Sequence, residues 1–522
     1  MLDENTQQLQ EQNKQLLIEV RQLKQRCEQF EASYNQLLYD FKLFQRNRFG
    51  SKSEQFIDPG QRSLFDEGSK KNDSLQEEKS EKEEGDNLIT IKSYKRRQKK
   101  SNLTFPPHLN RREEILKVEE EYCHCGRKKV SVGYKSKELL HHIREVLECI
   151  DQKREIMVCP NRCPGSMKTA KKPLHVLPRA KVTEEFLSHL IISKCDDRQP
   201  HYHFEKQLES RHGIKLSRDN LSRWFIQASK ALQPLWNLLK DEILDYDIAS
   251  IDPTSLQVLN EANRKPTQKG YWYCIRGGPP NKAVVLYDYN ATQHKLFLRD
   301  WFENFRGYLQ VDGENIFDVF IADPKVTLAY CNVHCRRNFE PIAKAARGDG
   351  VARKILQFYQ LIYQNEKEIK KRGLNSRERY DYRLEHSQPI FNRMKTYAEE
   401  TYHNLLPESP LGKGFHYLMN RWEGLTCFLK DGRLEADTNG TEREVKPAVM
   451  ARKMFLFAAS LEGAKALCIH MTLIRSAIYH GHDPYHYYVE ILKRIPYCQS
   501  IEEYEALLPW AISSERPYQK TA

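Results

Sequence analysis

The stretch DIASIDPTSLQVL (residues 247–259) changes the pattern of the chain from helical to strand-like. Segments of the same kind follow at GYWYCIRG (270–277), KAVVLYDYN (282–290), GYLQVDGE (307–314) and VTLAYCNVH (326–334). A helix-like segment, HKLFLRDWFENF (294–305), separates the third of these strands from the fourth. Successive strands, then a helix, then further strands predict a mixed α/β sheet.

Two aspartates in these strands stand where side chains project into a crevice. Asp252 lies within the first predicted strand, and Asp312 ends another strand just before Gly313, where the chain must turn. Ligands in sheets of this kind bind beside the strand ends. Each aspartate also has a plainer interpretation, because Pro253 makes Asp252 resemble a turn former and V-D-G is a common strand exit.

A third carboxylate comes from EADTNGTEREVKP (435–447), at the start of a predicted helix. Asn439 followed three positions later by Glu442 fits a capping box, in which Glu442 would serve only as a cap. Capping alone does not explain the cluster of cations that follows it, namely Arg443, Lys446, Arg452 and Lys453. Two aspartates on strands and one glutamate on a helix predict a site for two divalent cations, with Mg²⁺ or Mn²⁺ preferred by oxygen ligands.

The length and composition of the whole chain limit its number of folded units and its possible partners. Its 522 residues are too many for a single core, so we expect two to four folded units. A formal charge of +12 favours a polyanionic partner. The odd number of cysteines, 13, and the lack of an apolar signal core or membrane-spanning run predict a cytoplasmic protein without a membrane partner.

The N-terminal part predicts a coiled coil over residues 1–48. Its seam repeats every seven residues, at Leu2, Leu9, Leu16, Leu23, Phe30 and Leu37. Asn13 at an interior position favours a parallel homodimer or a higher homo-oligomer. A charged linker follows at 49–110, with an acidic block at 77–84 and a basic block at 92–100 that could lie along phosphates.

Residues 111–182 predict a zinc-finger-like domain. Its four candidate ligands are Cys123, Cys125, Cys159 and Cys163. The spacing is C-x-C and then C-x3-C, which departs from two C-x2-C pairs. His124 or Cys149 could replace one ligand, and free thiols are the alternative interpretation.

Residues 183–245 predict a helix-turn-helix-like DNA-binding domain. Gly213 is a candidate helix stop and Ser217 a candidate N-cap, and Leu221, Trp224, Phe225 and Ala228 then share one face of the next helix. That helix would present Arg218, Asn220 and Arg223 to a groove. A plain packing unit is the alternative, since helix pairs of this kind also occur without DNA. Beyond the sheet, 339–430 is long, charged and helical, and helical patterns return in the final segment.

The chain resembles the insertion sequence 66 family of bacterial transposases along nearly its whole length. Phrases similar to the family's occur in the family's order: RFGSKSEQ (48–55), LFDE (64–67), SKCDDRQPHYH (193–203), SIDPTS (250–255), QVDGE (310–314), CNVHCRRNF (331–339) and EADTNGTEREVKPAVMARKMFLFAAS (435–460). Pro253 replaces the usual Glu after the first aspartate, and Glu314 replaces an aromatic residue after the second.

This resemblance implies an RNase H-like catalytic core split between 246–338 and 431–522, with a helical insertion at 339–430. The fold class is therefore multidomain α/β plus α. Asp252, Asp312 and Glu442 match the family's DDE triad, whereas Asp437 is assigned to a turn. The implied activity is DNA cleavage at element ends and strand transfer into target DNA, in the bacterial cytoplasm and nucleoid, with accessory proteins of the same element as further partners.

Two other functions remain open on the sequence alone. The departures beside Asp252 and Asp312 leave room for a catalytically inactive, dimeric, sequence-specific DNA-binding protein derived from a transposase. A sequence-independent nuclease is a weaker option, because it would need neither a dimerising helix nor a recognition helix.

Overall fold

The computed structural model describes residues 173–292, 295–345 and 350–513, together with Lys24, Leu147 and the strands β1 (Ile156–Met157) and β2 (Lys168–Thr169), which pair antiparallel. The chain divides into two compact units, one of which is Pro59–Glu155. The predicted coiled coil at 1–48, the charged linker and the four candidate zinc cysteines lie outside the described residues.

A mixed sheet forms the centre of the described part. Its strands are β3 (Ile248–Asn260), β4 (Lys269–Gly277), β5 (Val284–Asn290), β6 (Gly307–Val311) and β7 (Val326–Tyr330). They lie in the order β5-β4-β3-β6-β7. Strand β4 pairs antiparallel with both β3 and β5, whereas β6 runs parallel to β3 and β7 runs parallel to β6. The predicted mixed α/β sheet is confirmed.

The composition of the strands explains which faces are covered. Trp272, Tyr273, Cys274 and Ile275 are consecutive in β4 and all buried, so both faces of this strand pack against other elements. Such a run of aromatic and β-branched residues is typical of a central strand. A short strand, β8 (Ala458–Ser460), pairs parallel with the far end of β3.

Helix α13 (Leu461–Tyr479) covers β5, which is at the edge of the sheet order. The side chains of Ser476 and Thr472 accept hydrogen bonds from the backbone N–H groups of Val285 and Tyr287, at 3.1 and 2.8 Å. Side-chain hydroxyls thus satisfy backbone donors that an edge strand would otherwise leave open.

Outside the segment from β7 to α12, the remaining helices are α2 (Glu184–Cys195), α3 (His201–His212), α4 (Arg218–Asp245), α5 (Lys295–Trp301), α14 (Pro484–Arg494) and α15 (Ile501–Glu505). The 3-10 turns there are η1 (Pro280–Lys282), η2 (Asn315–Phe320) and η4 (Ile495–Tyr497). The predicted stop and start around Gly213 and Ser217 are both present. Gly213 ends α3 with φ +68°, and the Ser217 side chain accepts a hydrogen bond from the N–H of Asn220.

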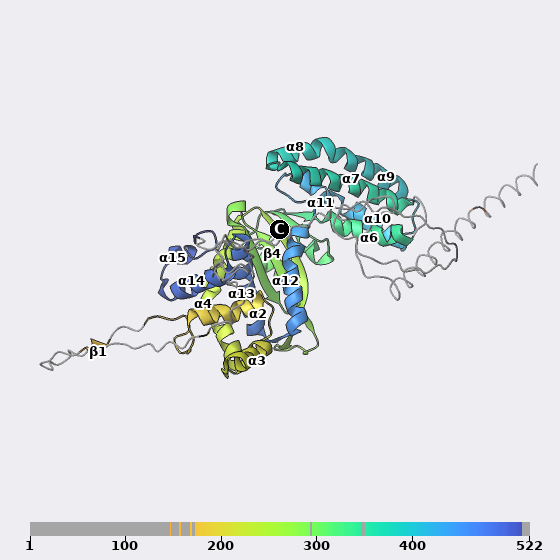
Figure 1. Ribbon diagram of the computed structural model, residues 1–522. Coiled ribbons are helices and arrows are strands. Elements are labelled where there is room, and N and C mark those ends of the chain that lie inside the picture. The colour runs from red at the N-terminus through yellow and green to blue at the C-terminus, as the bar shows by residue number, and fades with distance from the viewer. Residues whose placement is uncertain are drawn as a thin grey trace, which may run out of the picture. The chain divides into compact units, whose positions relative to one another are not determined.

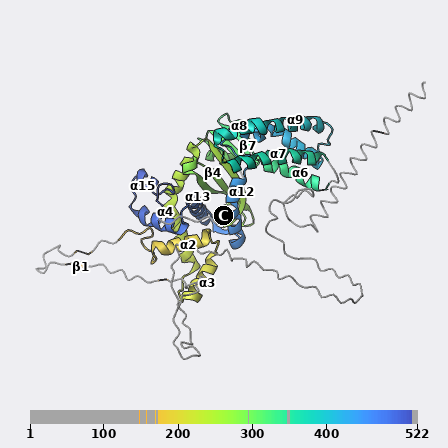
Figure 2. The same ribbon diagram turned by 45° about the horizontal axis from the view of Figure 1, so that its top comes forward.

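Between β7 and α12 (Asn439–Phe455) the chain is helical: α6 (Asn332–Ala345), α7 (Val351–Arg372), α8 (Ser376–His386), α9 (Gln388–Tyr402), α10 (Pro410–Asn420), α11 (Trp422–Leu425) and η3 (Cys427–Leu429). Helices α7, α8 and α9 lie side by side (Figures 1 and 2). Arg383 is fully buried among them, paired with Glu366 at 2.8 Å, and it donates to the carbonyls of Phe428 and Leu434 at 3.0 Å. These contacts join α7 and α8 to the segment that leads into α12.

No helix in the described part of the chain combines the length and the apolar character that crossing a membrane requires.

Candidate functional site

Asp252 and Asp312 are brought together by the parallel pairing of β3 and β6. Ser250 of β3 is in register with Gln310 of β6, so the residue two positions further along each strand is the aspartate in question. Asp252 is half-buried within β3, and Asp312, directly after β6, is only 8% exposed. The two carboxyl groups therefore lie at the same edge of neighbouring strands.

The turn after Asp312 is held by helix α10. Gly313 has φ +90°, a conformation that L side chains rarely adopt, and Asp312 Oδ1 accepts a hydrogen bond from the N–H of Glu314 at 2.9 Å. Tyr417 Oη donates to the carbonyl of Asp312 at 2.9 Å, and Arg421 Nε donates to the carbonyl of Gly313 at 3.0 Å. A Cβ at Gly313 would stand 2.1 Å from Tyr417 Oη, so only glycine fits here.

Glu442 reaches the same place from the first turn of α12. The segment before this helix is tied to the sheet side by Gln310, whose Nε2 donates to the carbonyl of Glu435 at 2.8 Å, and by buried Asn332, whose Nδ2 donates to the carbonyl of Ala436 at 3.0 Å. Thr441 Oγ1 then donates to Ser250 Oγ at 2.7 Å. These contacts place the start of α12 beside the β3 and β6 residues that carry the aspartates, and α12 runs along the sheet (Figure 1).

The alternative role of Glu442 in a capping box is wrong. The N-cap of α12 is Thr438, which makes no side-chain cap hydrogen bond, and Asn439 is the first helical residue. The N–H of Asn439 instead donates to Asp437 Oδ1 at 3.0 Å, a local turn contact of the kind expected for Asp437. Glu442 therefore has no capping role, and its carboxylate accepts a hydrogen bond from Arg337 at 3.3 Å.

The electrostatics of these carboxyl groups reflect their proximity. The pKa of Asp252 is raised to about 7, first by burial and then by the negative charges of Asp312, Glu442 and Glu314, with Arg337 opposing. Burial also raises the pKa of Asp312, and Glu442 adds to this effect. A cluster of acids that repel one another in a partly buried cleft is typical of a functional site, and a divalent cation would relieve the repulsion.

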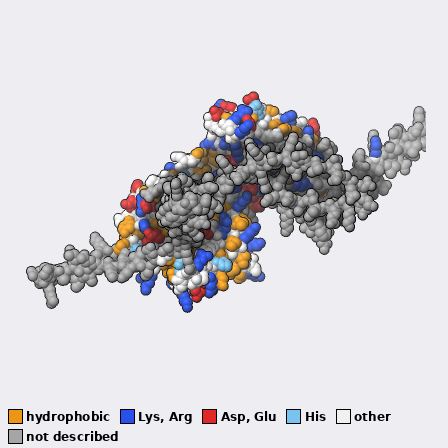
Figure 3. All heavy atoms as spheres, viewed as in Figure 1, with side chains coloured by type: hydrophobic (Ala, Val, Ile, Leu, Met, Phe, Trp, Pro, Cys, Tyr) orange, Lys and Arg blue, Asp and Glu red, His pale blue; other side chains and the backbone are white. Residues whose placement is uncertain are grey.

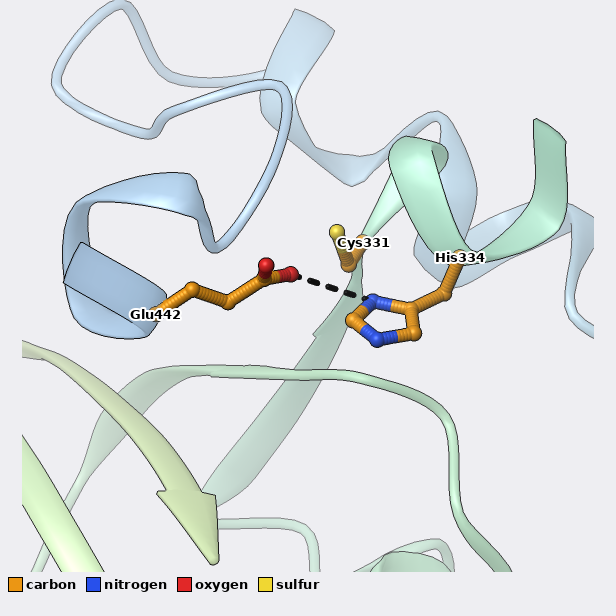
Figure 4. Close-up of side chains that lie close together, drawn as sticks. All are labelled: Cys331, His334 and Glu442. Atoms are coloured by element: carbon orange, nitrogen blue, oxygen red, sulfur yellow. Dashed lines mark ion pairs between the residues drawn. The ribbon is translucent and has the colours of Figure 1, made fainter. Parts of the chain in front are cut away.

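A second set of side chains meets Glu442 from the start of α6. Figure 4 shows the Glu442 carboxylate pointing toward the ring of His334, with the sulfur of Cys331 beside them. The ligand atoms of these three residues lie within 4.8 Å of one another, and theirs is the only such group of three among the described ranges. Glu442 Oε1 and His334 Nδ1 are 3.8 Å apart, and both are buried without a hydrogen-bond partner.

This spacing could hold a metal ion, but the proton on His334 argues for a different role. Arg337 lies 3.3 Å from His334 Nε2, and since a guanidinium only donates, Nε2 must accept. Burial lowers the pKa of His334, so the neutral ring then carries its proton on Nδ1, the nitrogen that a metal would need. Arg337 also donates to Glu442 Oε2 at 3.3 Å. We therefore assign Arg337 to holding the Glu442 carboxylate, with the His334 ring beside it.

The four cations that follow Glu442 in the sequence differ in their surroundings. Arg443, Lys446 and Lys453 are exposed on α12, whereas Arg452 donates to Thr254 Oγ1 at 3.2 Å and to Ser255 Oγ at 2.7 Å in β3. The lower part of α12 in Figure 3 carries cationic and hydrophobic side chains side by side on the surface. The exposed apolar residues here are Met450 and Met454 on α12, and Leu456 and Phe457 directly after it.

In the predicted helix-turn-helix, Arg218 is exposed and pairs with Glu205 of α3 at 3.2 Å, and Arg223 is exposed and donates to Asn220. Leu221, Trp224, Phe225 and Ala228 are buried together, which confirms the predicted inner face of α4. The structure therefore leaves the arginines on the outer face, where a partner would have to compete with their present contacts.

Several residues of the site carried no assigned role from the sequence. His334 and Arg337 lie in the phrase CNVHCRRNF, whose closely spaced cysteine, histidine and arginines were a usable signal. Tyr417 and Arg421 have no such signal, because no motif surrounds them in the sequence. They contact the backbone of Asp312 and Gly313 only in the folded structure.

Comparisons with known proteins relate this chain to a family of transposases. A family model described as "Transposase IS66 family" matches residues 179–466, and models described as "IS66 C-terminal element" and "Transposase C of IS166 homeodomain" match residues 472–510 and 36–113. Two uncharacterized proteins of Sinorhizobium fredii are similar to this chain. The protein y4jD is 27% identical over 78% of this chain and 82% of its own length, and y4qI is 26% identical over 78% and 76%.

Proposed function

Because the chain belongs to the IS66 family of transposases, we propose that it cuts DNA strands at the ends of an insertion element and joins the freed 3′ ends to target DNA. Family membership and the homeodomain-like match at 36–113 indicate DNA binding. The observation that carries the catalytic proposal is the convergence of Asp252, Asp312 and Glu442: β3 and β6 pair in parallel register, and Thr441, beside Glu442, donates to Ser250 of β3.

The mixed sheet supports an RNase H-like core with a DDE triad. Asp252 lies on the first strand of the sheet, Asp312 follows the fourth, and Glu442 comes from a helix after the helical segment 332–429. The donors at this site are carboxylates that carry excess negative charge, which fits Mg²⁺ or Mn²⁺. Such cations, when bound, stabilise the charge that develops on phosphate oxygens during cleavage.

The chain's own residues would hold the reacting groups in place. Asp252 and Asp312 sit on adjacent strands, and α10 fixes the turn that follows Asp312. His334 and Arg337 flank the Glu442 carboxylate and restrain its direction. In this proposal the triad binds the cations, and the neighbouring side chains hold the triad in position.

Cations around the triad would hold the DNA backbone. We assign phosphate binding to Arg443, Lys446 and Lys453, which are exposed on α12, and DNA contact to Arg218 and Arg223 of α4. Arg452 is bound to β3, so in this proposal it positions α12 rather than a phosphate.

The remaining parts of the proposal concern the N-terminal residues. A homo-oligomer formed by the coiled coil at 1–48 would bring two element ends together. Zinc would stabilise the segment that contains its four proposed ligands, Cys123, Cys125, Cys159 and Cys163. Accessory proteins of the same element complete the expected partners.

Cleavage of a supercoiled plasmid that carries the element ends, in Mg²⁺, tests the proposal. Asp312→Asn and Glu442→Gln should abolish strand cleavage because each removes a negative ligand. Asp300→Asn, an exposed aspartate on α5, is the matched control and should cleave like the wild type. Full cleavage by Asp312→Asn would overturn the proposal. If the wild type binds the ends and never cleaves, the inactive DNA-binding protein is the better description.

A further inference from the structure

A cavity of about 1030 Å³ opens next to the turn after Asp312. Gly313, Glu314 and Asn315 line it, together with His416 and Tyr417 of helix α10. Tyr402, at the end of α9, closes the far side. The cavity thus lies between the sheet's catalytic edge and the helical segment that interrupts the core.

The cavity adjoins the acid cluster at Glu314. Glu314 lines it, and the N–H of Glu314 donates to Asp312 Oδ1 at 2.9 Å. The charge of Glu314 also raises the pKa of Asp252, so these two carboxyl groups lie near each other. A DNA strand whose phosphodiester bond lies at the triad would therefore pass its next nucleotide along this wall.

Aromatic side chains in fixed positions line the cavity. His416 Nδ1 lies 3.0 Å from Tyr402 Oη, and His416 Nε2 lies 2.8 Å from Asn420 Nδ2. The ring of Tyr417 is held by its hydrogen bond to Asp312 and by the guanidinium of Arg421, 5.0 Å from the ring centroid. Rings that are already ordered lose little conformational entropy on stacking against a planar ligand.

The charged groups favour an anionic ligand with a planar part. Lys295, Lys413 and Arg421 line the cavity, against the carboxylates of Glu314 and Glu408. Cations combined with aromatic faces are the usual means by which proteins bind unpaired nucleotides, because every base has a face for stacking. Lys413 pairs with Glu408 at 3.1 Å and Arg421 donates to the carbonyl of Gly313, so the cavity wall is polar and suits a charged ligand better than a purely apolar one.

We propose that this cavity binds an unpaired nucleotide of the DNA strand whose phosphodiester bond lies at Asp252, Asp312 and Glu442. The inference rests on the proposed function for the identity of the strand. Tyr402, His416 and Tyr417 contact the base, and Lys413 lies near the backbone phosphate.

Binding of fluorescent oligothymidylate tests the inference, as a single strand and as a duplex with oligoadenylate, measured by anisotropy with the full chain in EDTA. Tyr402→Ala should weaken single-strand binding by about 5- to 100-fold, the usual contribution of one stacked base. Duplex binding should not change. Tyr402→Phe keeps the ring and should bind the single strand within about twofold of wild type.

Tyr397→Ala is the matched control, because Tyr397 lies on the same helix and packs against Phe358 instead of lining the cavity. It should leave single-strand affinity unchanged. In a second measurement, single strands that carry 5-iododeoxyuridine should cross-link under light to Tyr402, His416 or Tyr417, located by mass spectrometry. Wild-type affinity in Tyr402→Ala, an equal loss with the duplex, or cross-links only elsewhere would overturn the inference.

These outcomes separate the inference from the proposed catalysis. Loss of single-strand binding in Tyr402→Ala, in a chain that never cleaves plasmid in Mg²⁺, would support the nucleotide site and reject the catalytic proposal. Normal binding by Tyr402→Ala, in a chain that does cleave, would reject the nucleotide site alone.

Discussion

Replacing Asp252 by asparagine should stabilise the metal-free protein at alkaline pH. The pKa of Asp252 is raised from 3.8 to about 7, with burial as the largest cause and the neighbouring carboxylates next. Asparagine has nearly the same shape and cannot ionise, so Asp252→Asn removes the cost of charging this site. A residue that only served as a turn former would not behave in this way.

The size and sign of the effect follow from the difference in proton binding. Between about pH 4 and pH 7 the unfolded chain has released the Asp252 proton while the folded chain still holds it, so the free energy of unfolding falls as pH rises. Each pKa unit corresponds to about 1.4 kcal/mol, and a rise of roughly three units gives about 4 kcal/mol. This penalty is absent near pH 4 and fully present above pH 7.

Urea unfolding followed by tryptophan fluorescence measures the difference. In EDTA at pH 8, Asp252→Asn should be more stable than wild type by up to about 4 kcal/mol, and at pH 5 by less than half of that. Adding Mg²⁺ at a hundred times its dissociation constant should stabilise wild type by about 2.7 kcal/mol and the variant by much less. Asp300→Asn, on the exposed face of α5, should follow wild type throughout.

Two results would refute this reasoning. If Asp252→Asn is no more stable than wild type at pH 8 in EDTA, the acids do not repel one another in the folded protein. If Mg²⁺ stabilises wild type and variant equally, Asp252 is not a ligand of the cation.

Three further substitutions test other parts of the site. Gly313→Ala should lower the free energy of unfolding by about 3 kcal/mol, because of the positive φ and a clash with Tyr417 Oη. In a Tyr417→Phe background this cost should fall by about 1 kcal/mol, as measured by urea titration. Equal costs in both backgrounds would contradict the contact. Arg452→Ala should lower the melting temperature because Arg452 donates to Thr254 and Ser255 of β3. Lys453→Ala should leave the melting temperature unchanged and should reduce the slope of log DNA affinity against log salt concentration by about one. The reverse pattern would exchange the roles of the two residues. Arg383→Met should destabilise by about 3–5 kcal/mol because it leaves a buried glutamate unpaired, and a thermal shift within error of wild type would count against that.

The local part of the structure was predictable because it depends on short-range patterns. The strand periodicity of 247–259 and its successors, the stop at Gly213 and the cap at Ser217 are properties of a few neighbouring residues, and the structure confirms each of them. The buried face of α4 followed in the same way from helical spacing. The capping box at Asn439, the plainer alternative for Glu442, is absent, because Thr438 is the N-cap and Asp437 accepts the N–H of Asn439, and local preference could not choose between these arrangements.

The sequence by itself determined the strands β3 to β7, the helix limits at Gly213 and Ser217 and, through the family phrases, which acids to examine. Only the tertiary structure decided that α10 holds the turn after Asp312, that His334 and Arg337 flank Glu442, and that Arg452 binds β3. The physical reason is separation along the chain: Tyr417 and Asp312 are 105 residues apart, and Arg337 and Glu442 are also 105 apart. Contacts at such separation arise from how whole elements pack, which no short pattern specifies.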